Sequence, residues 1–178
     1  MQVERHRYAV KGWGMGELWT AEGRVVEHDF TLGNPQARGP EGTPESPSST
    51  VAGPDARDGD DFVPMLIERL RRLLDGEPVD LADVPLELGW CTPFQRAVID
   101  TARAVPWGDL VTYGELAALA GYPGAARAVG SVCAQNRFWL IVPCHRVVAA
   151  QGLGGYGSSG TALKERLLEL EGVPVAAL

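Results

Sequence analysis

Residues 33–61 are almost devoid of large apolar side chains, and this constrains the fold more than any other feature of the sequence. The segment consists mainly of Gly, Pro, Ser, Thr, Asp and Glu. Such a composition cannot bury enough apolar surface to join a core. We therefore expect a flexible surface insertion at about residues 33–61, with the core built from the residues on either side of it.

The residues before and after this segment predict a small α/β domain at residues 1–90. Three β-rich runs cover residues 8–13, 16–20 and 25–32, and Ala21-Glu22-Gly23 is a plausible turn between the last two. Apolar residues then recur at helical spacing from Phe62 to Leu74, and Gly76 and Pro78 end the pattern. We expect an antiparallel sheet that is covered by one helix.

Residues 91–178 predict a second, mostly helical domain. Thr92 is a candidate N-cap and is followed by Pro93 at the first helical position, in a helix that ends before Pro106. Two further helices at residues 112–120 and 124–135 are separated by Gly-Tyr-Pro, as in a helix-turn-helix. We also expect a short buried strand at residues 139–142 and a last helix at residues 161–171. The predicted fold class is α+β.

Charge is distributed unevenly along the chain. The formal net charge is -7. Residues 1–90 hold 9 basic and 17 acidic residues, net -8, whereas residues 91–178 hold 7 basic and 6 acidic residues, net +1. Affinity for nucleic acid normally comes from clustered Lys and Arg. If the protein binds DNA, the second half must therefore bind it, through shape and a few placed arginines.

Other features of the composition bear on location and cofactors. No apolar run approaches the roughly 20 residues that cross a bilayer, and the N-terminus is not of the secretory type. We expect a soluble, cytoplasmic protein without a membrane partner. The three cysteines Cys91, Cys133 and Cys144 include no CxxC pair, which argues against a disulfide framework and a thiolate zinc site.

Cys144 is the candidate nucleophile. A free thiol has a pKa of about 8.5, so at neutral pH it needs a base, and the base needs an orienting partner. His145 is the candidate base, and Glu171 or another carboxylate of the last helix is the candidate partner. A Cys-His neighbour pair alone decides little, because buried cysteines are usually inert and adjacent side chains tend to point apart.

A wider set of motifs resembles one known family, the O6-alkylguanine-DNA alkyltransferases, or methylated-DNA-protein-cysteine methyltransferases. The resemblance covers nearly all of residues 92–172, in order and with few gaps. The Pro-Cys-His-Arg-Val element is its most specific part. The matching elements are Phe94-Gln95, Val105-Pro106-Trp107-Gly108, Tyr113-Gly114-Glu115-Leu116-Ala117, Ala125-Ala126-Arg127-Ala128-Val129-Gly130, Asn136, Ile141-Val142-Pro143-Cys144-His145-Arg146-Val147-Val148, Gly155-Tyr156, Lys164 and Leu168 to Gly172.

This resemblance implies a fold and a partner. The N-terminal domain is expected to be loosely ribonuclease H-like and to pack on the C-terminal domain. The partner is double-stranded DNA bearing O6-alkylguanine, bound through the minor groove, and the protein is expected to act as a monomer. Small residues on the recognition helix permit close approach to a narrow groove, and the damaged base must be flipped out to meet a buried thiol. The implied DNA-binding residues are Arg127, Tyr113, Ala125, Ala126, Ala128 and Gly130.

The resemblance also implies the reaction, an irreversible single-turnover DNA repair in which the alkyl group moves to Cys144. No cofactor is needed. Glu171 would orient His145, which would draw the proton of Cys144 through a water. Asn136 would brace the turn beside the cysteine, while Tyr113 and Lys164 would assist the departing guanine. The implied pocket residues are Val147, Trp139, Tyr156, Ser158 and Ser159.

Two departures from the family pattern have consequences. Where the family usually has prolines after the asparagine, this chain has Arg137-Phe138-Trp139, which places Trp139 against the alkyl-binding side of the pocket. In addition, His6 and His28 stand without a cysteine partner before Cys91. We therefore predict no structural zinc and no other metal.

Three alternatives remain open. The nearest is a non-catalytic relative that binds lesions and flags them for other repair factors; such relatives replace the cysteine, whereas Cys144 is present here. The second is a helix-turn-helix regulator, which gives no reason for the matching spacing of His145, Asn136 and Glu171. The third is a cysteine hydrolase, for which no oxyanion site is apparent.

Overall fold

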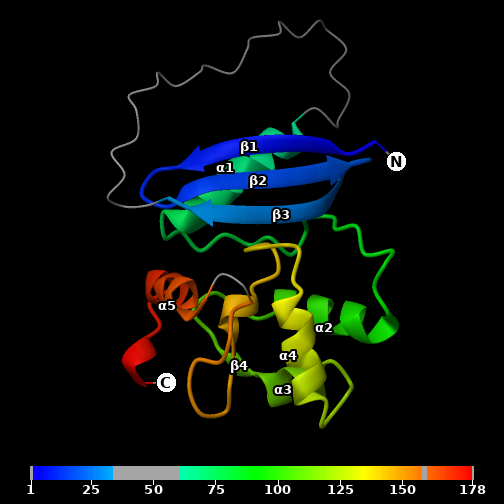
Figure 1. Cartoon of the computed structure of the whole chain (residues 1–178), viewed down its shortest axis with the longest axis vertical. Coiled ribbons are helices and arrows are strands. Elements are labelled where there is room, and N and C mark those ends of the chain that lie inside the picture. Colours follow the sequence, from blue (N-terminus) through cyan, green and yellow to red (C-terminus); the bar gives the residue numbers. More distant parts are fainter. Residues whose placement is uncertain (1, 34–60, 158–159, 178) are drawn as a thin grey trace, which may run out of the picture.

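The computed structural model describes residues 2–33, 61–157 and 160–177. This part of the chain has an α+β fold, with a three-stranded antiparallel sheet above a group of helices (Figure 1). The expected insertion at residues 33–61 lies almost entirely outside the described residues, as do Ser158 and Ser159. None of the helices within these ranges is long and apolar enough to cross a membrane.

The sheet is a meander in the order β1-β2-β3. Its strands are β1 (Glu4–Val10), β2 (Gly14–Ala21) and β3 (Arg24–Leu32). The expected turn between β2 and β3 is confirmed: Glu22 (φ 51°) and Gly23 (φ 73°) both adopt left-handed backbone, as a two-residue hairpin turn requires.

The predicted first strand at residues 8–13 is wrong at both ends. It begins at Glu4, because Arg5 and Arg7 on the exposed face both pair with Glu17 of β2. It ends at Val10, because Gly12 adopts left-handed backbone (φ 79°) and turns the chain. The predicted second strand at residues 16–20 extends further at each end.

One helix, α1 (Phe62–Leu74), covers one face of the sheet, as the sequence pattern predicts (Figure 1). Apolar residues recur on its inner side at spacings of three and four, which places them on one stripe. The indole of Trp13 donates a hydrogen bond of 2.9 Å to the carbonyl of Leu74 at the end of the helix. The buried residues of α1 are Leu66, Leu70, Leu73 and Leu74.

The four helices of the C-terminal half lie where the sequence predicts them, to within one or two residues. Thr92 and Thr112 each cap a helix in a capping box, with Gln95 and Glu115 as the reciprocal partners. These boxes explain why the starts of two helices could be predicted closely. The helices are α2 (Pro93–Arg103), α3 (Tyr113–Leu119), α4 (Ala126–Ala134) and α5 (Thr161–Leu170).

Short elements complete this half. The strands β4 (Val111–Thr112) and β5 (Val147–Val148) pair in parallel, and η1 (Cys144–Arg146) and η2 (Val175–Ala177) are 3-10 turns. The predicted strand at residues 139–142 is wrong. Leu140 adopts left-handed backbone (φ 64°) and the amide of Val142 donates to the carbonyl of Phe138 at 2.9 Å. The apolar run is a buried turn.

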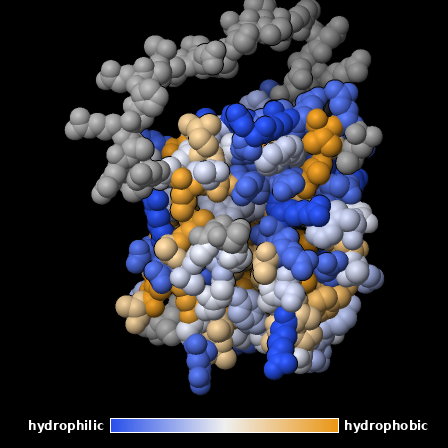
Figure 2. Space-filling view, in the orientation of Figure 1, coloured by the Kyte–Doolittle hydropathy of each residue, from blue (hydrophilic) through white to orange (hydrophobic). Residues whose placement is uncertain are grey.

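The sheet and the helices share one buried apolar cluster. The edge strand β3 lies nearest to the C-terminal helices (Figure 1), and its His28 forms a parallel bridge with Phe138. On α5, Arg166 donates to the carbonyl of Gly12 at 2.8 Å and lies 3.6 Å from the ring centre of Trp13. Figure 2 shows hydrophilic and hydrophobic side chains interspersed over this face of the molecule.

Candidate active site around Cys144

Cys144 lies at the start of the turn η1, directly after the buried turn at residues 138–142. Its amide donates to the carbonyl of Val142 at 2.8 Å, and its side chain is almost fully buried. Two cavities, of about 130 Å³ and about 70 Å³, both reach it. The thiol is therefore shielded from bulk water but stands beside space that a small group can enter.

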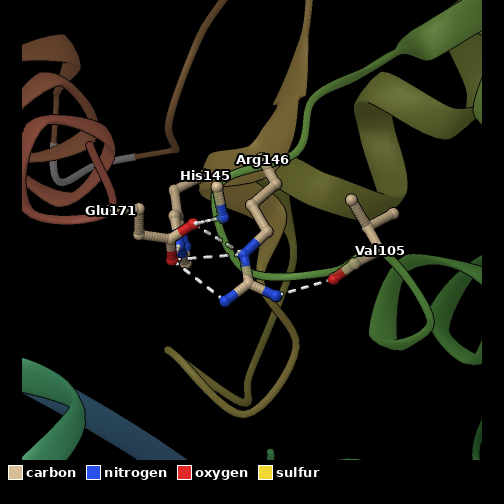
Figure 3. Close-up of polar contacts among 5 residues, drawn as sticks. Val105, His145, Arg146 and Glu171 are labelled. Atoms are coloured by element: carbon tan, nitrogen blue, oxygen red, sulfur yellow. Dashed lines mark hydrogen bonds and ion pairs between the residues drawn. The ribbon is translucent and has the colours of Figure 1, made fainter. Parts of the chain in front are cut away.

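Next to it, His145, Arg146 and Glu171 form a buried network (Figure 3). Nε2 of His145 lies 2.7 Å from Oε1 of Glu171. Arg146 donates to both carboxylate oxygens through Nε, at 3.1 and 3.0 Å. The amide of Gly108 donates to Oε2 at 3.0 Å, and Nη1 of Arg146 donates to the carbonyl of Val105 at 2.7 Å. The carboxylate is thus saturated with donors.

This network determines the protonation of His145. Burial raises the pKa of Glu171, but hydrogen bonds from His145 and Arg146 outweigh burial and bring that pKa to about 2. Burial lowers the pKa of His145, partly offset by Glu171. A neutral imidazole beside a carboxylate must donate through Nε2, which leaves Nδ1 as a proton acceptor. Within the described residues, Nδ1 has no hydrogen-bond partner.

A second thiol, Cys133 in the last turn of α4, interacts directly with that of Cys144. This contact, followed by burial, raises the pKa of Cys144, while the same contact lowers the pKa of Cys133. Two interacting thiols release one proton far more readily than two, so ionisation of one opposes ionisation of the other. Both cysteines line both cavities.

Lys164 supplies a positive charge close to the two thiols. Its side chain is fully buried on α5, and Nζ donates to the carbonyl of Val147 at 2.5 Å and to that of Gly155 at 3.2 Å. Burial lowers the pKa of Lys164 to about 8, against the opposing influence of Cys133 and Cys144. The ammonium in turn lowers the pKa of both thiols.

Asn136 contacts the turn that leads to Cys144, and Tyr113 lines the smaller cavity together with Cys144. Nδ2 of Asn136 donates to the carbonyl of Val142 at 3.0 Å, and its Oδ1 accepts from the amide of Phe138 at 2.9 Å. The amide side chain therefore braces the turn that leads to the cysteine. Tyr113, at the start of α3, lines the smaller cavity and donates to the carbonyl of Gly155 at 3.4 Å.

The expected pocket residues are divided between the cavities and the core. Trp139 lines the larger cavity, and Tyr156 lines both. Val147 is fully buried and lines neither, while its carbonyl accepts from Lys164. Ser158 and Ser159 lie outside the described residues.

The expected DNA-binding residues other than Tyr113 lie on α4 and just before it, while Tyr113 begins α3. Arg127 and Ala128 are exposed, whereas Ala125, Ala126 and Gly130 are partly exposed. Gly130 also lines the smaller cavity, together with Tyr113 and Cys144. One side of α4 thus adjoins the space in front of the thiol. Among the residues that the structure describes, no three His, Cys, Asp or Glu side chains gather into a group that could hold a metal ion.

Two members of this site were not predicted as functional from the sequence. Arg146 was predicted only as part of the Pro-Cys-His-Arg-Val motif, without a role of its own. In the structure it binds the same carboxylate as His145. Cys133 was counted only as an unpaired cysteine. An arginine that follows an apolar run and a histidine is a signal for a buried ion pair, because buried arginines need partners. No comparable signal exists for Cys133.

Comparison with known proteins identifies the family. A family model described as the DNA binding domain of 6-O-methylguanine DNA methyltransferase matches residues 93–173. The chain is similar to the methylated-DNA-protein-cysteine methyltransferase of Methanothermobacter thermautotrophicus, with 43% identity over 108 residues, 61% of this chain and 60% of that relative's length. A protein of the same name from Saccharolobus islandicus is 39% identical over 120 residues, 67% of this chain and 76% of that relative.

Solved structures agree with these matches. The crystal structure of Mycobacterium tuberculosis OGT in complex with DNA is similar, with a TM-score of 0.68 and 33% identity over 96% of this chain and 95% of that one. The structural match includes the N-terminal sheet, for which the sequence offered no motif. The resemblance found in the sequence is confirmed, and this chain belongs to the methylated-DNA-protein-cysteine methyltransferase family.

Proposed function

We propose that this protein repairs O6-alkylguanine in DNA by direct reversal, moving the alkyl group irreversibly onto Cys144. The observation that carries the proposal is the buried pair of His145 and Glu171 directly after Cys144, with Nε2 of the histidine 2.7 Å from the carboxylate and its Nδ1 without a hydrogen-bond partner among the described residues. The names of the relatives support the same activity.

The proposed chemistry uses only side chains of this site. His145 draws the proton of Cys144 through a water, and Glu171 stabilises the imidazolium that forms. The thiolate attacks the alkyl carbon in line, so that a carbon–sulfur bond forms as the bond to O6 breaks. Guanine departs with the electron pair, and Tyr113, near Lys164, protonates it. The thioether has no hydrolytic route back, so each molecule acts once, without a cofactor.

DNA binding in this proposal uses α3 and α4 as a helix-turn-helix. The small residues of α4 enter the minor groove of double-stranded DNA, Arg127 fills the gap left by the extruded nucleotide, and Tyr113 helps to rotate the base. The exposure of Arg127 and the position of Tyr113 on the smaller cavity support this arrangement.

The remaining parts of the proposal concern the whole protein. The domains are residues 1–90 and 91–178, and we take the sheet with α1 as a reduced ribonuclease H-like unit. The protein acts as a monomer in the cytoplasm and at the nucleoid, without a metal. In the pocket, main-chain groups of Cys144 and Val147, with Ser158 or Ser159, read the guanine edge.

Mass spectrometry tests the transfer. The pure protein is mixed with duplex DNA carrying one O6-methylguanine, and the intact mass and the peptides are measured. We expect one methyl group per molecule, on the peptide with Cys144. Cys144→Ala abolishes the transfer, whereas Cys133→Ala, which removes the neighbouring thiol, retains it. Tight lesion binding without methylation would replace the proposal with the non-catalytic lesion-binding function, and would point to Trp139 as the obstruction.

A further inference from the structure

The N-terminal sheet contributes directly to the larger cavity beside Cys144. Three consecutive residues of β3 line it together with Cys144. The end of α4 and the turn that leads to the cysteine also line it. The cavity therefore lies between the two halves of the chain, although the family model covers only residues 93–173. The residues of β3 on its wall are Glu27, His28 and Asp29.

His28 joins β3 to the turn that carries Trp139. Its amide donates to the carbonyl of Arg137 at 2.7 Å, and its carbonyl accepts from the amide of Trp139 at 3.1 Å. Its ring adds a third bond, between Nδ1 and the carbonyl of Trp139. A carbonyl only accepts, so Nδ1 carries the hydrogen and Nε2 is an acceptor. The hydroxyl of Tyr8 donates to that Nε2 at 2.6 Å.

The ring of His28 is thereby fixed in one orientation and one tautomer. Its side chain is 2% exposed, and burial lowers its pKa to about 4. The imidazole is therefore neutral at physiological pH. The Trp139 carbonyl that it holds also accepts from the amide of Ile141 at 2.8 Å, inside the turn before Cys144.

The indole of Trp139 is also held by the sheet. It stacks on the ring of Phe30, with centroids 4.7 Å apart and planes 14° from parallel. Trp139 is 7% exposed and lines the same cavity as Cys144. Both the backbone and the ring of this residue thus take their positions from β3, through His28 and Phe30.

We propose that His28 is a positioning residue by which the N-terminal sheet sets the size of the alkyl group that Cys144 accepts. The inference rests on the proposed function, and it concerns a strand outside the matched domain. With Trp139 clamped, the wall stays close to the thiol and favours methyl over bulky groups. When the clamp is released, the indole can withdraw, and the loosened turn presents Cys144 less well to a small group.

Two substitutions separate the two hydrogen bonds of the His28 ring. In His28→Asn the side-chain amide nitrogen takes the place of Nδ1, so the hydrogen bond to the carbonyl of Trp139 is kept. The hydrogen bond from the hydroxyl of Tyr8 is lost, because nothing replaces Nε2. In His28→Gln the amide reaches the position of Nε2 and keeps the Tyr8 partner, while the donor to Trp139 is lost. Phe30→Leu removes the ring that stacks on the indole and leaves the atoms of both hydrogen bonds in place.

The experiment measures single-turnover transfer from duplex DNA carrying O6-methylguanine or O6-benzylguanine, by mass spectrometry against time. The amplitude gives the fraction of active molecules, and the rate constant describes those molecules alone. A merely structural role lowers the amplitude equally for both substrates. We expect His28→Gln and Phe30→Leu to slow methyl transfer and to raise the benzyl-to-methyl ratio of rate constants at least about fivefold, while His28→Asn stays within about twofold of the wild type.

Other outcomes are equally informative. If the benzyl-to-methyl ratio in His28→Gln stays at the wild-type value, the positioning role of His28 is wrong, whatever Phe30→Leu shows and even if the active fraction falls. An equal change in His28→Asn and His28→Gln would also overturn it, because the bond to Trp139 would then not be the cause. Failure of the wild type to transfer methyl at all would reject the proposed function instead, and the same assay reveals it.

Discussion

Glu171 is the residue on which the candidate site depends most directly. Its buried carboxylate accepts hydrogen bonds from His145, Arg146 and Gly108, and the side chains of His145 and Arg146 are themselves buried. Removing one partner of a buried ion pair leaves the other charge uncompensated, and this costs more than the pair itself contributes. The same carboxylate also fixes the tautomer of His145.

We predict that Glu171→Gln lowers both stability and transfer rate. The unfolding free energy should fall by about 3–5 kcal/mol, and the rate constant per active molecule by roughly a hundredfold or more because the base loses its orienting charge. Urea unfolding and single-turnover kinetics measure the two effects. Glu169→Gln, exposed in the last turn of α5 just before Glu171, is the matched control. An unchanged rate constant would show that Glu171 serves only stability.

Cys133 leads to a prediction about pH. Because its contact raises the pKa of Cys144, Cys133→Ala should lower that pKa and move the rise of the transfer rate to lower pH. The rate is measured between pH 5 and 9. The cysteine control is Cys91→Ala, since Cys91 lines neither cavity. A profile that stays in place or moves to higher pH would mean that Cys133 does not raise the pKa of Cys144.

At the residue scale, the sequence indicated which side chains could take part in the chemistry better than it indicated which of them touch. The position of Glu171 beside His145, 26 residues away in the chain, was expected because the motifs resemble a known family. Cys133 was missed because its contact with Cys144 depends on the path of the chain between α4 and η1. The spacing of residues in the sequence does not predict that path.

At the element scale, β3 and the turn at residues 138–142 behave as one unit. They are connected through His28, whose pKa falls from 6.5 to about 4 on burial. Below pH 6.5 the unfolded chain binds a proton at this residue that the folded protein does not. Its linked contribution to stability is therefore complete above pH 6.5 and is lost progressively as the pH falls toward 4.

We predict that this single group removes up to about 3 kcal/mol of stability between pH 7 and pH 4. Urea unfolding at several pH values should show a steeper loss for the wild type than for His28→Asn, which has no titrating group at this position. The absolute stability of the variant is irrelevant, because only the two slopes are compared. Parallel slopes would contradict the prediction.

Helices proved more predictable than strands and turns. Two helices begin at capping boxes, and α1 carries an apolar stripe that only a helix can bury. The run from Trp139 to Val142 has no such internal signal. Four apolar residues can form a buried strand or a buried turn, and the left-handed backbone of Leu140 decides for the turn. The turn is held by β3, because His28 hydrogen-bonds with the backbone of Arg137 and Trp139.

At the scale of the whole molecule, the charge distribution bears on DNA binding. The first 90 residues carry a net charge of -8 and the remainder +1. Few phosphates can then be neutralised, so binding should depend only weakly on salt. This property could be predicted from the sequence alone, because it depends on counts and not on packing.

We predict that affinity for an undamaged duplex falls with a log–log salt slope no steeper than about -3, and that Arg127→Ala flattens it by about one. Fluorescence anisotropy over a range of salt concentrations measures both. Arg96→Ala, an exposed arginine on α2, is the control that should leave the slope unchanged. A steep slope in the wild type would reveal a basic surface that the charge count hides.

The position of β3 on the wall of the larger cavity has a consequence for how relatives diverge. The candidate catalytic residues all lie within residues 93–173, the range that the family model matches. The wall residues lie in a strand outside that range. Two relatives with the same motifs can therefore come to prefer different lesions through drift in the N-terminal sheet alone, and an exchange of that sheet between them would transplant the preference.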